Sequence, residues 1–187
     1  MVEEGVIEHL FESSSGLAKF LADAGEPSFY IAYTEQFRKT LLLSAASYFE
    51  ASVRDFLVDY VNEKSHSDAR LIAFLKAKAI ERQYHTYFNW DGNNANNFFG
   101  LFGAEFRELM TARVSADQDL KMAVRAFLEL GKLRNELVHR DYANFPLDKT
   151  AEDIFALYEA ARGFVRELPQ LLRTGDKPPD GGHDEST

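Results

Sequence analysis

The sequence contains no cysteine. Disulfide frameworks, thiolate metal ligands and cysteine nucleophiles are therefore all excluded. Its apolar runs are far shorter than the roughly 20 residues that a membrane span needs. The first residues are acidic and lack the basic start of a secretory signal. We therefore expect a cytoplasmic protein that does not enter a membrane.

The chain also lacks a surplus of basic residues. Its 30 Asp and Glu residues outnumber its 21 Lys and Arg residues, which gives a formal net charge of −9. This balance argues against a broad basic surface for duplex DNA. It still leaves room for a small basic site, because Lys132, Arg134, His139 and Arg140 form a locally positive stretch.

A convincing β-strand pattern is absent as well, whereas apolar residues recur at spacings of three and four along most of the chain. This periodicity predicts an all-α fold, a bundle of about five or six helices in a single domain over residues 1–173. We expect residues 1–26 to form a helical extension of that domain. Residues 174–187 have no hydrophobic anchor and are expected to form a disordered tail. The expected helices cover residues 3–23, 28–63, 69–85, 96–113, 115–140 and 150–172.

Local signals indicate where several of these helices begin. Ser67 or Asp68 is expected to cap the helix that follows the loop at 62–68. The stretches Ser115–Gln118 and Thr150–Asp153 have the form of helix-opening capping boxes. The helix over 28–63 would be roughly 50 Å long, so the alternatives of a kink or a break near Ser44–Ser47 stay open.

The helix at 118–140 is unusual because its apolar face is very wide. At 100° per residue the apolar arc covers roughly 240°, against about 100° for an ordinary surface helix. Such a helix is central in the fold or packs on a second chain. Arg134 projects into the middle of the arc, and a buried guanidinium needs partners. Either it pairs with a carboxylate such as Glu50 or Asp141, or the helix lines a cleft in which Arg134 holds an anion.

His139 lies four residues after Asn135, so the two share a face of the same helix. It projects about 140° away from Arg134, so a regular helix does not point the two side chains in one direction. One interpretation is that His139 simply meets the negative end of the helix dipole. The other is that a long arginine, the end of the helix or a second protomer brings Arg134 and His139 together.

The stretch LRNELVHRDY resembles the HEPN superfamily of helical domains, which carry an arginine, a polar residue and then a histidine near the end of a late helix. Here that motif is Arg134-Asn135 followed by His139. The long segment at 41–61 and the stretch FNWDGNNANNFF are similar to one subgroup, the RiboL-PSP type. The resemblance covers most of residues 27–172 and implies a HEPN-like helical bundle.

The resemblance implies a metal-independent endoribonuclease that needs no cofactor, often a toxin or a phage-defence effector. It implies a homodimer in which two motifs face one cleft and form a composite site. An antitoxin or another defence-system protein is then an expected partner, and RNA is the expected substrate.

The resemblance also implies roles for particular residues. Arg134 and His139 would be catalytic, with Asn135 orienting the histidine or the phosphate. Glu50, on an adjacent helix, would either pair with Arg134 or be an ordinary exposed glutamate. In some HEPN toxins a tyrosine two residues after the histidine is adenylylated, and Tyr142 lies one residue further along than that pattern requires.

Other readings of the same residues stay open. Lys132 and Arg140 flank the motif and are expected to contact RNA, but the acidic net charge also suits a non-catalytic HEPN module that binds a partner or a nucleotide. A purely structural helical dimer is a third reading. Trp90 and its neighbouring phenylalanines are better read as core than as a platform for stacking bases.

Overall fold

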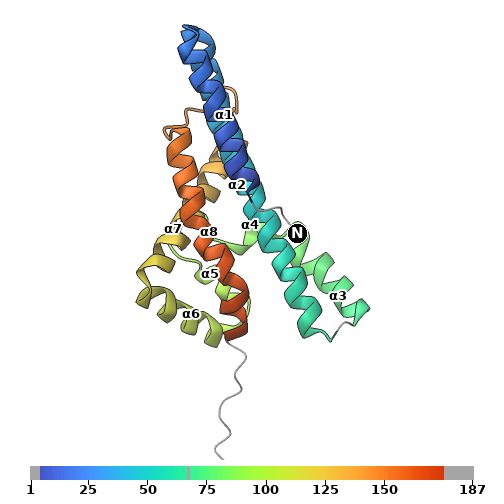
Figure 1. Ribbon diagram of the computed structural model, residues 1–187. Helices are drawn as coiled ribbons and strands as arrows, with labels where there is room; N and C mark the ends of the chain where they lie inside the picture. Colours follow the sequence, from blue (N-terminus) through green and yellow to red (C-terminus); the bar gives the residue numbers. More distant parts are fainter. Residues whose placement is uncertain (1–4, 67, 175–187) are drawn as a thin grey trace, which may run out of the picture.

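The computed structural model describes residues 5–66 and 68–174, and over these residues the fold is all-α with no strand. This confirms the predicted fold class (Figure 1). Two of the expected helices, at 69–85 and 96–113, are each divided, which makes the elements more numerous than five or six. The elements are α1 (Val6–Asp23), α2 (Pro27–Lys64), α3 (Ala69–Leu75), the π-helix η1 (Lys76–Ile80), α4 (Tyr84–Tyr87), α5 (Asn96–Gly100), α6 (Ala104–Ala116), α7 (Gln118–His139) and α8 (Ala151–Thr174).

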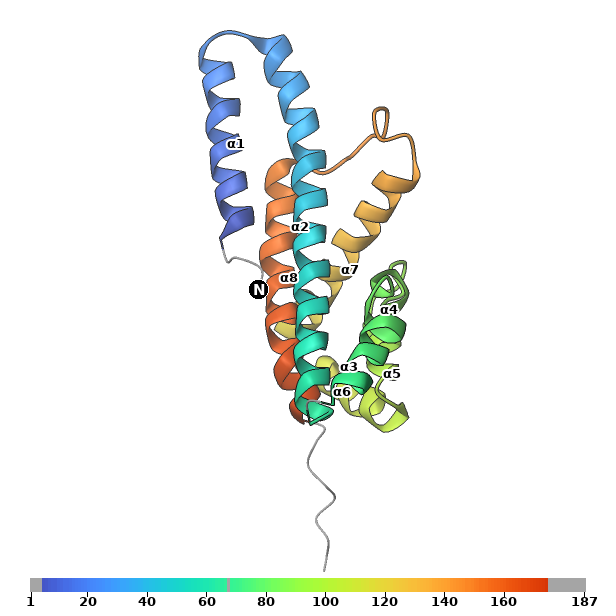
Figure 2. The ribbon, with the colours of Figure 1, turned by 90° about the vertical axis from the view of Figure 1, so that its right-hand side faces the viewer.

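Helix α2 is the axis of the molecule (Figure 2). Pro27 lies in its first turn, where a missing N–H costs no hydrogen bond. The helix then continues for 38 residues, so no break interrupts it at Ser44–Ser47. Its buried side carries apolar residues at helical spacing, and it packs on α1, α7 and α8. The largest of these buried side chains are Phe37, Leu41, Leu42, Phe49, Val53 and Leu57.

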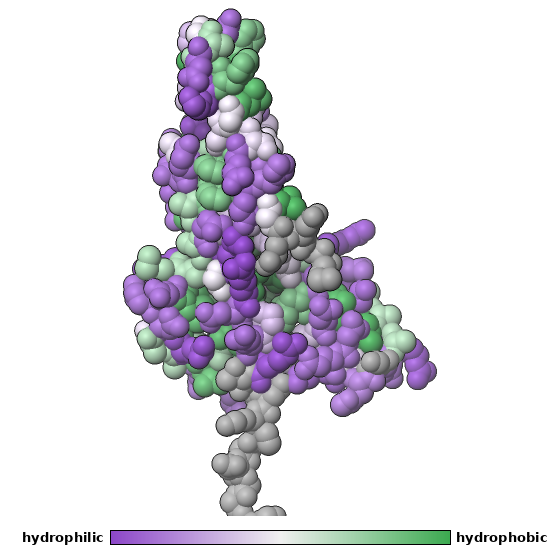
Figure 3. All heavy atoms as spheres, viewed as in Figure 1, coloured by the Kyte–Doolittle hydropathy of each residue, from purple (hydrophilic) through white to green (hydrophobic). Residues whose placement is uncertain are grey.

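Helices α1 and α2 form a hairpin that extends beyond the other helices (Figures 1 and 2). Near the start of α1, Phe11 stacks on Phe155 of α8 with ring centroids 4.2 Å apart, and Glu8 pairs with Arg162. The beginning of the expected extension is therefore part of the core. At the far end of the hairpin, hydrophobic side chains remain on the surface (Figure 3), including Phe20 and Phe29.

The expected helix at 69–85 is wrong as a single element. It begins at one of the two expected capping residues, because the Asp68 carboxylate accepts hydrogen bonds from the N–H groups of Arg70 and Leu71; the other, Ser67, lies outside the described residues. It then widens into η1 and ends, and Arg82 adopts a left-handed φ of 61°. The Tyr87 hydroxyl donates to the carbonyl of Ala79 at 2.6 Å, so a tertiary contact satisfies backbone that the helix leaves unpaired.

The expected helix at 96–113 is also wrong as a single element. Helix α5 ends at Gly100, and Gly103 adopts a φ of 107° before α6 begins. A non-glycine residue rarely adopts this conformation, so Gly103 suits the break. The short α5 buries Phe98 and Phe99 completely, and this burial fixes where the chain must turn.

One predicted capping box is wrong and the other is confirmed. Ser115 lies inside α6, where its hydroxyl donates to the Thr111 carbonyl. Asp117 caps α7 instead, because its carboxylate accepts from the N–H of Leu120 at 3.0 Å. At the start of α8, the Asp153 carboxylate accepts from the N–H of Thr150 at 2.9 Å, and the Thr150 hydroxyl accepts from the N–H of Asp153 at 3.1 Å, as predicted.

Helix α7 is central, which explains most of its wide apolar face. It packs on α8, α2 and α6. Met122 and Val138 remain exposed, with 56% and 41% of their surface accessible. Phe127 joins a cluster of rings with Phe88 and Phe164, at centroid distances of 4.9 and 5.3 Å. The other buried residues of α7 are Leu120, Ala123, Val124, Ala126, Leu128, Leu130 and Leu137.

Candidate active site

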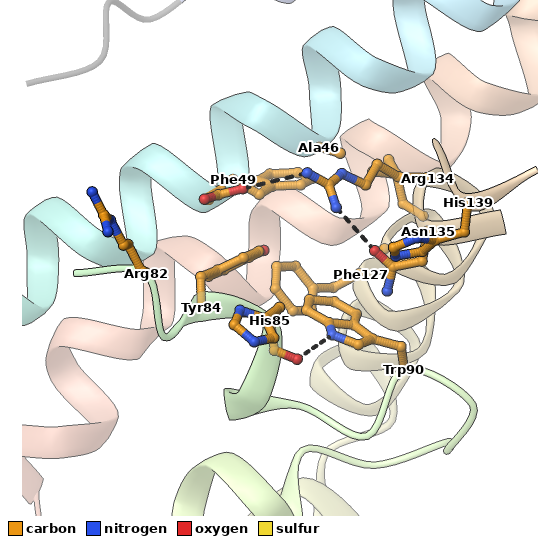
Figure 4. A pocket seen from close by; sticks show the side chains of 13 residues that line it. Ala46, Phe49, Arg82, Tyr84, His85, Trp90, Phe127, Arg134, Asn135 and His139 are labelled. Carbon is orange, nitrogen blue, oxygen red and sulfur yellow. Dashed lines mark hydrogen bonds and ion pairs between the residues drawn. The ribbon is translucent and has the colours of Figure 1, made fainter. Parts of the chain in front are cut away.

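A cavity of about 500 Å³ lies between α2, the segment at 82–90 and α7 (Figure 4). Each of the three elements contributes side chains to its wall. From α2 come Ala46, Phe49 and Glu50; from the segment at 82–90 come Arg82, Tyr84, His85 and Trp90; from α7 come Phe127, Leu130, Gly131, Arg134, Asn135 and His139.

Arg134 reaches this cavity from the middle of the apolar face of α7. Its Nη1 donates to Oδ1 of Asn135 at 3.1 Å, and its Nη2 lies 4.0 Å from Oε2 of Glu50. The side chain is 36% exposed, so the guanidinium is not buried in the core. Because a guanidinium carries five N–H donors, it keeps donors for an anion after these two contacts.

His139 is the last residue of α7 and lines the same cavity as Arg134 and Asn135. Arg140, the next residue, is extended, so the histidine sits where the helix ends. The end of the helix and the length of the arginine side chain are therefore enough to bring Arg134 and His139 to one cavity. A single chain achieves this, although their projections on a regular helix differ widely.

Glu50 and Tyr84 add an acidic group and a phenol to the wall. Burial raises the pKa of Tyr84, the Glu50 carboxylate raises it further, and the Arg134 guanidinium opposes them. The hydroxyl of Tyr84 therefore stays protonated near neutral pH. It is available as a hydrogen-bond donor beside the guanidinium.

Trp90 closes the cavity on the side of α7. Its Nε1 donates to the carbonyl of His85 at 3.0 Å, and its ring contacts Phe88 at a centroid distance of 5.1 Å. A Cβ atom at Gly131 would lie 2.1 Å from Cζ3 of this ring. Gly131 is thus required for the ring to pack against α7. These contacts agree with the core role expected for Trp90, although the ring also faces the cavity.

The other predicted site residues lie outside the cavity wall. Lys132 is exposed and its Nζ is 3.4 Å from Oδ1 of Asp91. Arg140 lies over the ring of Phe145, with its guanidinium carbon 5.8 Å from the centroid. The Tyr142 carbonyl accepts a hydrogen bond from Nζ of Lys39 at 2.8 Å, and this ammonium also lies 5.3 Å from the centre of the Tyr142 ring.

Asp141, the alternative partner considered for Arg134, has other contacts. Its carboxylate accepts hydrogen bonds from the side chain of Asn144 at 2.6 Å and from the N–H of Ala143. These bonds lower the pKa of the Asp141 carboxyl. Of the two carboxylates that the sequence offered, the structure therefore places Glu50 beside Arg134.

Arg82, Tyr84 and His85 are cavity residues that sequence reasoning did not find. They lie in a dense polar and aromatic run, ERQYHTYFNW at 81–90, which could have drawn attention. The run fell inside and just after the helix expected at 69–85, so no face of it was assigned to a site. Only the break at Glu81 and Arg82 turns these side chains toward α2 and α7.

No helix within residues 5–66 and 68–174 is both long enough and apolar enough to cross a membrane. The sequence model of the RiboL-PSP-HEPN family matches residues 8–174. No curated protein and no solved structure matches the chain.

Proposed function

Because the chain belongs to the RiboL-PSP-HEPN family, we propose that it is an endoribonuclease that cleaves RNA by attack of the 2′-hydroxyl on the adjacent phosphate. The observation that carries the proposal is the meeting of Arg134, Asn135 and His139 in one cavity. The products would be a 2′,3′-cyclic phosphate and a free 5′-hydroxyl.

The residue types suit this chemistry. RNA supplies its own nucleophile, so the protein needs to move protons and to stabilise negative charge on the phosphate. Histidine is the side chain that exchanges protons near neutral pH, and His139 would take part in a proton transfer. Arg134 would bind the phosphate oxygens by charge-assisted hydrogen bonds, held in place by its hydrogen bond to Asn135.

The proposed reaction requires neither a metal ion nor a cofactor. The cellular role that best fits a nuclease of this family is that of a toxin or a phage-defence effector in the cytoplasm. An antitoxin or defence-system protein would then restrain or trigger it. We also propose that the chain forms a homodimer, and the exposed Val138 beside His139 offers a surface that a second copy could cover.

A second candidate function rests on Glu50. Its carboxylate lies 4.0 Å from Nη2 of Arg134 and would compete with a phosphate for the guanidinium. A cavity of this kind could bind a nucleotide or a partner without cleaving RNA. The chain would then be a non-catalytic HEPN module or a regulatory subunit of a toxin–antitoxin or defence system.

Cleavage of RNA by the purified protein in the presence of EDTA tests the proposal. We expect Arg134→Ala and His139→Ala to abolish cleavage while the circular dichroism spectrum is retained. Arg125→Ala and His9→Ala are matched controls, since both side chains are exposed and neither lines the cavity. Binding of RNA without cleavage by the unaltered protein would favour the non-catalytic function, and full activity of His139→Ala would contradict the mechanism.

A further inference from the structure

A second cavity, of about 740 Å³, lies between α2 and the segment formed by η1 and the two residues that follow it. Its walls consist of Arg54, Asp55, Val58 and Asp59 of α2, and of Lys76, Ile80, Glu81 and Arg82. We call the cavity that holds Arg134 the first cavity and this one the second cavity. Arg82 lines both of them, so it lies where the two cavities adjoin.

The two cavities follow each other along the same pair of walls. Glu50 of the first cavity and Arg54 of the second are four residues apart in α2, so they share a face of that helix. On the opposite wall, His85 lines the first cavity and Ile80 lines the second. In Figure 4, Arg82 lies at the opposite end of the first cavity from His139. The second cavity therefore continues the first in the direction away from His139.

The wall that contains Arg82 has an irregular backbone. The chain widens into the π-helix η1, and Arg82 then adopts a left-handed φ of 61°. Turns of π-helix occur often at functional sites, and a left-handed conformation is costly for a residue that carries a side chain. The protein retains this cost at the residue that lines both cavities, which indicates a role for Arg82 beyond the fold.

Three basic side chains of the second cavity are available to an anion. Within residues 5–66 and 68–174, Arg54, Lys76 and Arg82 form no ion pair. Arg54 and Arg82 are exposed, and Lys76 is half-buried. Their guanidinium and ammonium groups therefore keep N–H donors for phosphate oxygens.

Acidic side chains line the same cavity, namely Asp55, Asp59 and Glu81. A free phosphate ion would gain little from such a balanced set of charges. The backbone of RNA presents a different pattern, because each charged phosphate is followed by a ribose whose 2′-hydroxyl is both a donor and an acceptor. The basic groups match the phosphates, and the carboxylates match the hydroxyl donors. The second cavity thus suits a ribonucleotide chain better than a simple anion.

We propose that the second cavity binds the sugar–phosphate backbone of an RNA strand whose scissile phosphate lies at Arg134, and that Arg82 holds the strand where it passes between the cavities. Arg54 and Lys76 bind the next phosphates. Such contacts position the strand and do not read its sequence. This inference rests on the proposed function, because it extends the site of that reaction. It leaves the His139 end of the first cavity to the motif of a second chain in the proposed homodimer.

Binding of a fluorescently labelled RNA of ten nucleotides, measured by anisotropy, tests the second cavity. The measurements use His139→Ala protein, which the proposed mechanism predicts to be unable to cleave the probe. Added to this background, Arg54→Ala and Lys76→Ala should each raise the Kd several-fold. Each should also lower the slope of log Kd against log salt concentration by about 0.7, the value for one phosphate of a single strand. Arg70→Ala is the matched control, since Arg70 is exposed on α3 and lines neither cavity.

Arg82 needs variants that suit its backbone. Arg82→Gly removes the side chain and tolerates the left-handed φ, whereas Arg82→Lys keeps a positive charge at the same place. The glycine variant should raise the Kd several-fold and lower the salt slope as above. The lysine variant should recover most of the affinity, which a purely structural role of Arg82 does not predict.

The length of the substrate separates the two cavities. A dinucleotide has a single phosphate between its nucleosides, and the first cavity would bind it, whereas ten nucleotides also reach the second cavity. With His139 intact, Arg54→Ala and Arg82→Gly should lower kcat/KM more for the longer RNA than for the dinucleotide, mainly by raising KM. Equal losses on both substrates would show that the effect arises outside the second cavity, and would overturn the inference.

The outcomes also distinguish this inference from the proposed function. If the unaltered protein cleaves RNA, and the variants of Arg54, Lys76 and Arg82 bind the ten-nucleotide probe as tightly as Arg70→Ala with an unchanged salt slope, the inference is wrong and the proposed function stands. If the unaltered protein does not cleave RNA but these variants bind it more weakly, the proposed function fails and the second cavity is still an RNA-binding site. An absence of any RNA binding would overturn both.

Discussion

Glu50 on α2 and Arg134 on α7 face each other across the cavity, with 4.0 Å between Oε2 and Nη2. Both side chains are more than a third exposed, so the pair contributes little to the stability of the fold. Its importance lies in the competition between the Glu50 carboxylate and a phosphate for the Arg134 guanidinium. The negative charge of Glu50 partly neutralises the positive charge of Arg134, which would otherwise attract a phosphate.

Glu50→Gln should separate the effect of the pair on stability from its effect on phosphate binding, because it keeps the shape of the side chain and removes the charge. We expect the free energy of unfolding to change by less than about 1 kcal/mol. The KM for an RNA oligonucleotide should fall several-fold, since the phosphate no longer competes with a carboxylate for Arg134. Denaturant titration and steady-state kinetics measure the two quantities. A higher KM would show instead that Glu50 positions Arg134 for substrate.

Gly131→Ala should disturb the cavity through Trp90. The added Cβ would lie 2.1 and 2.2 Å from two carbons of the indole ring, so the ring must move. We expect a loss of about 1–3 kcal/mol in the free energy of unfolding, the usual cost of overpacking. Trp90 is the single tryptophan in the sequence, so its fluorescence reports the displacement directly.

The matched control for this change is Gly16→Ala in α1. A Cβ at Gly16 meets no atom within 4 Å, and alanine favours the helix over glycine by about 0.5–1 kcal/mol. The control should therefore stabilise the protein and leave the fluorescence spectrum unchanged. An unshifted Trp90 spectrum in Gly131→Ala would mean that the ring is not packed against α7.

The sequence predicted well those features that depend on local chemistry. The 38-residue α2 follows from its uninterrupted periodicity, and the start of α8 follows from Thr150 and Asp153, whose hydrogen bonds are local. The Arg134, Asn135 and His139 motif was also recognisable in the sequence. The structure brings these three residues to one cavity with Glu50, although their roles remain predictions.

The other wall of the cavity could not be predicted because it depends on tertiary contacts. Residues 69–85 have helical periodicity, and the sequence alone does not show that Tyr87 will bond the Ala79 carbonyl or that Arg82 will adopt a left-handed φ. The wrong prediction of Ser115 as the capping residue of α7 has a different cause. Ser115 and Asp117 are both good capping residues, and the choice of Asp117 depends on where α6 ends.

Asp153→Asn should change the pH dependence of stability. The Thr150 N–H, followed by the Thr150 hydroxyl, lowers the pKa of the Asp153 carboxyl in the folded protein. A depressed pKa means that the charged carboxylate stabilises the fold above its unfolded value of about 3.9, and that this contribution is lost as the pH falls through the folded pKa. The variant should therefore lose stability at pH 7 and show a shallower decline below about pH 4.

Thermal unfolding measured between pH 7 and pH 3 checks this prediction. Glu152→Gln is the control, since Glu152 is an exposed acid in the same helical turn. The melting temperatures of the two variants should differ most at neutral pH and become similar at acidic pH. Parallel curves for Asp153→Asn and the unaltered protein across the whole range would contradict the assignment.

Lys39→Met should loosen the loop that follows His139. Lys39 is a buried lysine of α2, only 5% exposed, and its ammonium donates to the carbonyls of Tyr142 and Ala143 at 2.8 and 3.1 Å. Methionine matches its length and removes both donors, so two carbonyls lose their partner. We expect a loss of about 2–3 kcal/mol in the free energy of unfolding, because hydrogen bonds from a charged donor are stronger than neutral ones.

The same substitution should also affect catalysis, since these carbonyls lie three and four residues after His139. Hydrogen exchange at residues 141–145 should accelerate more than exchange in the middle of α7, and kcat should fall more than KM rises. Lys19→Met is the control: Lys19 is exposed and pairs with Asp23 on the surface of α1, so stability and activity should hardly change. Uniform acceleration of exchange across α7 and the loop would indicate that Lys39 supports the whole fold and does not specifically hold the loop beside His139.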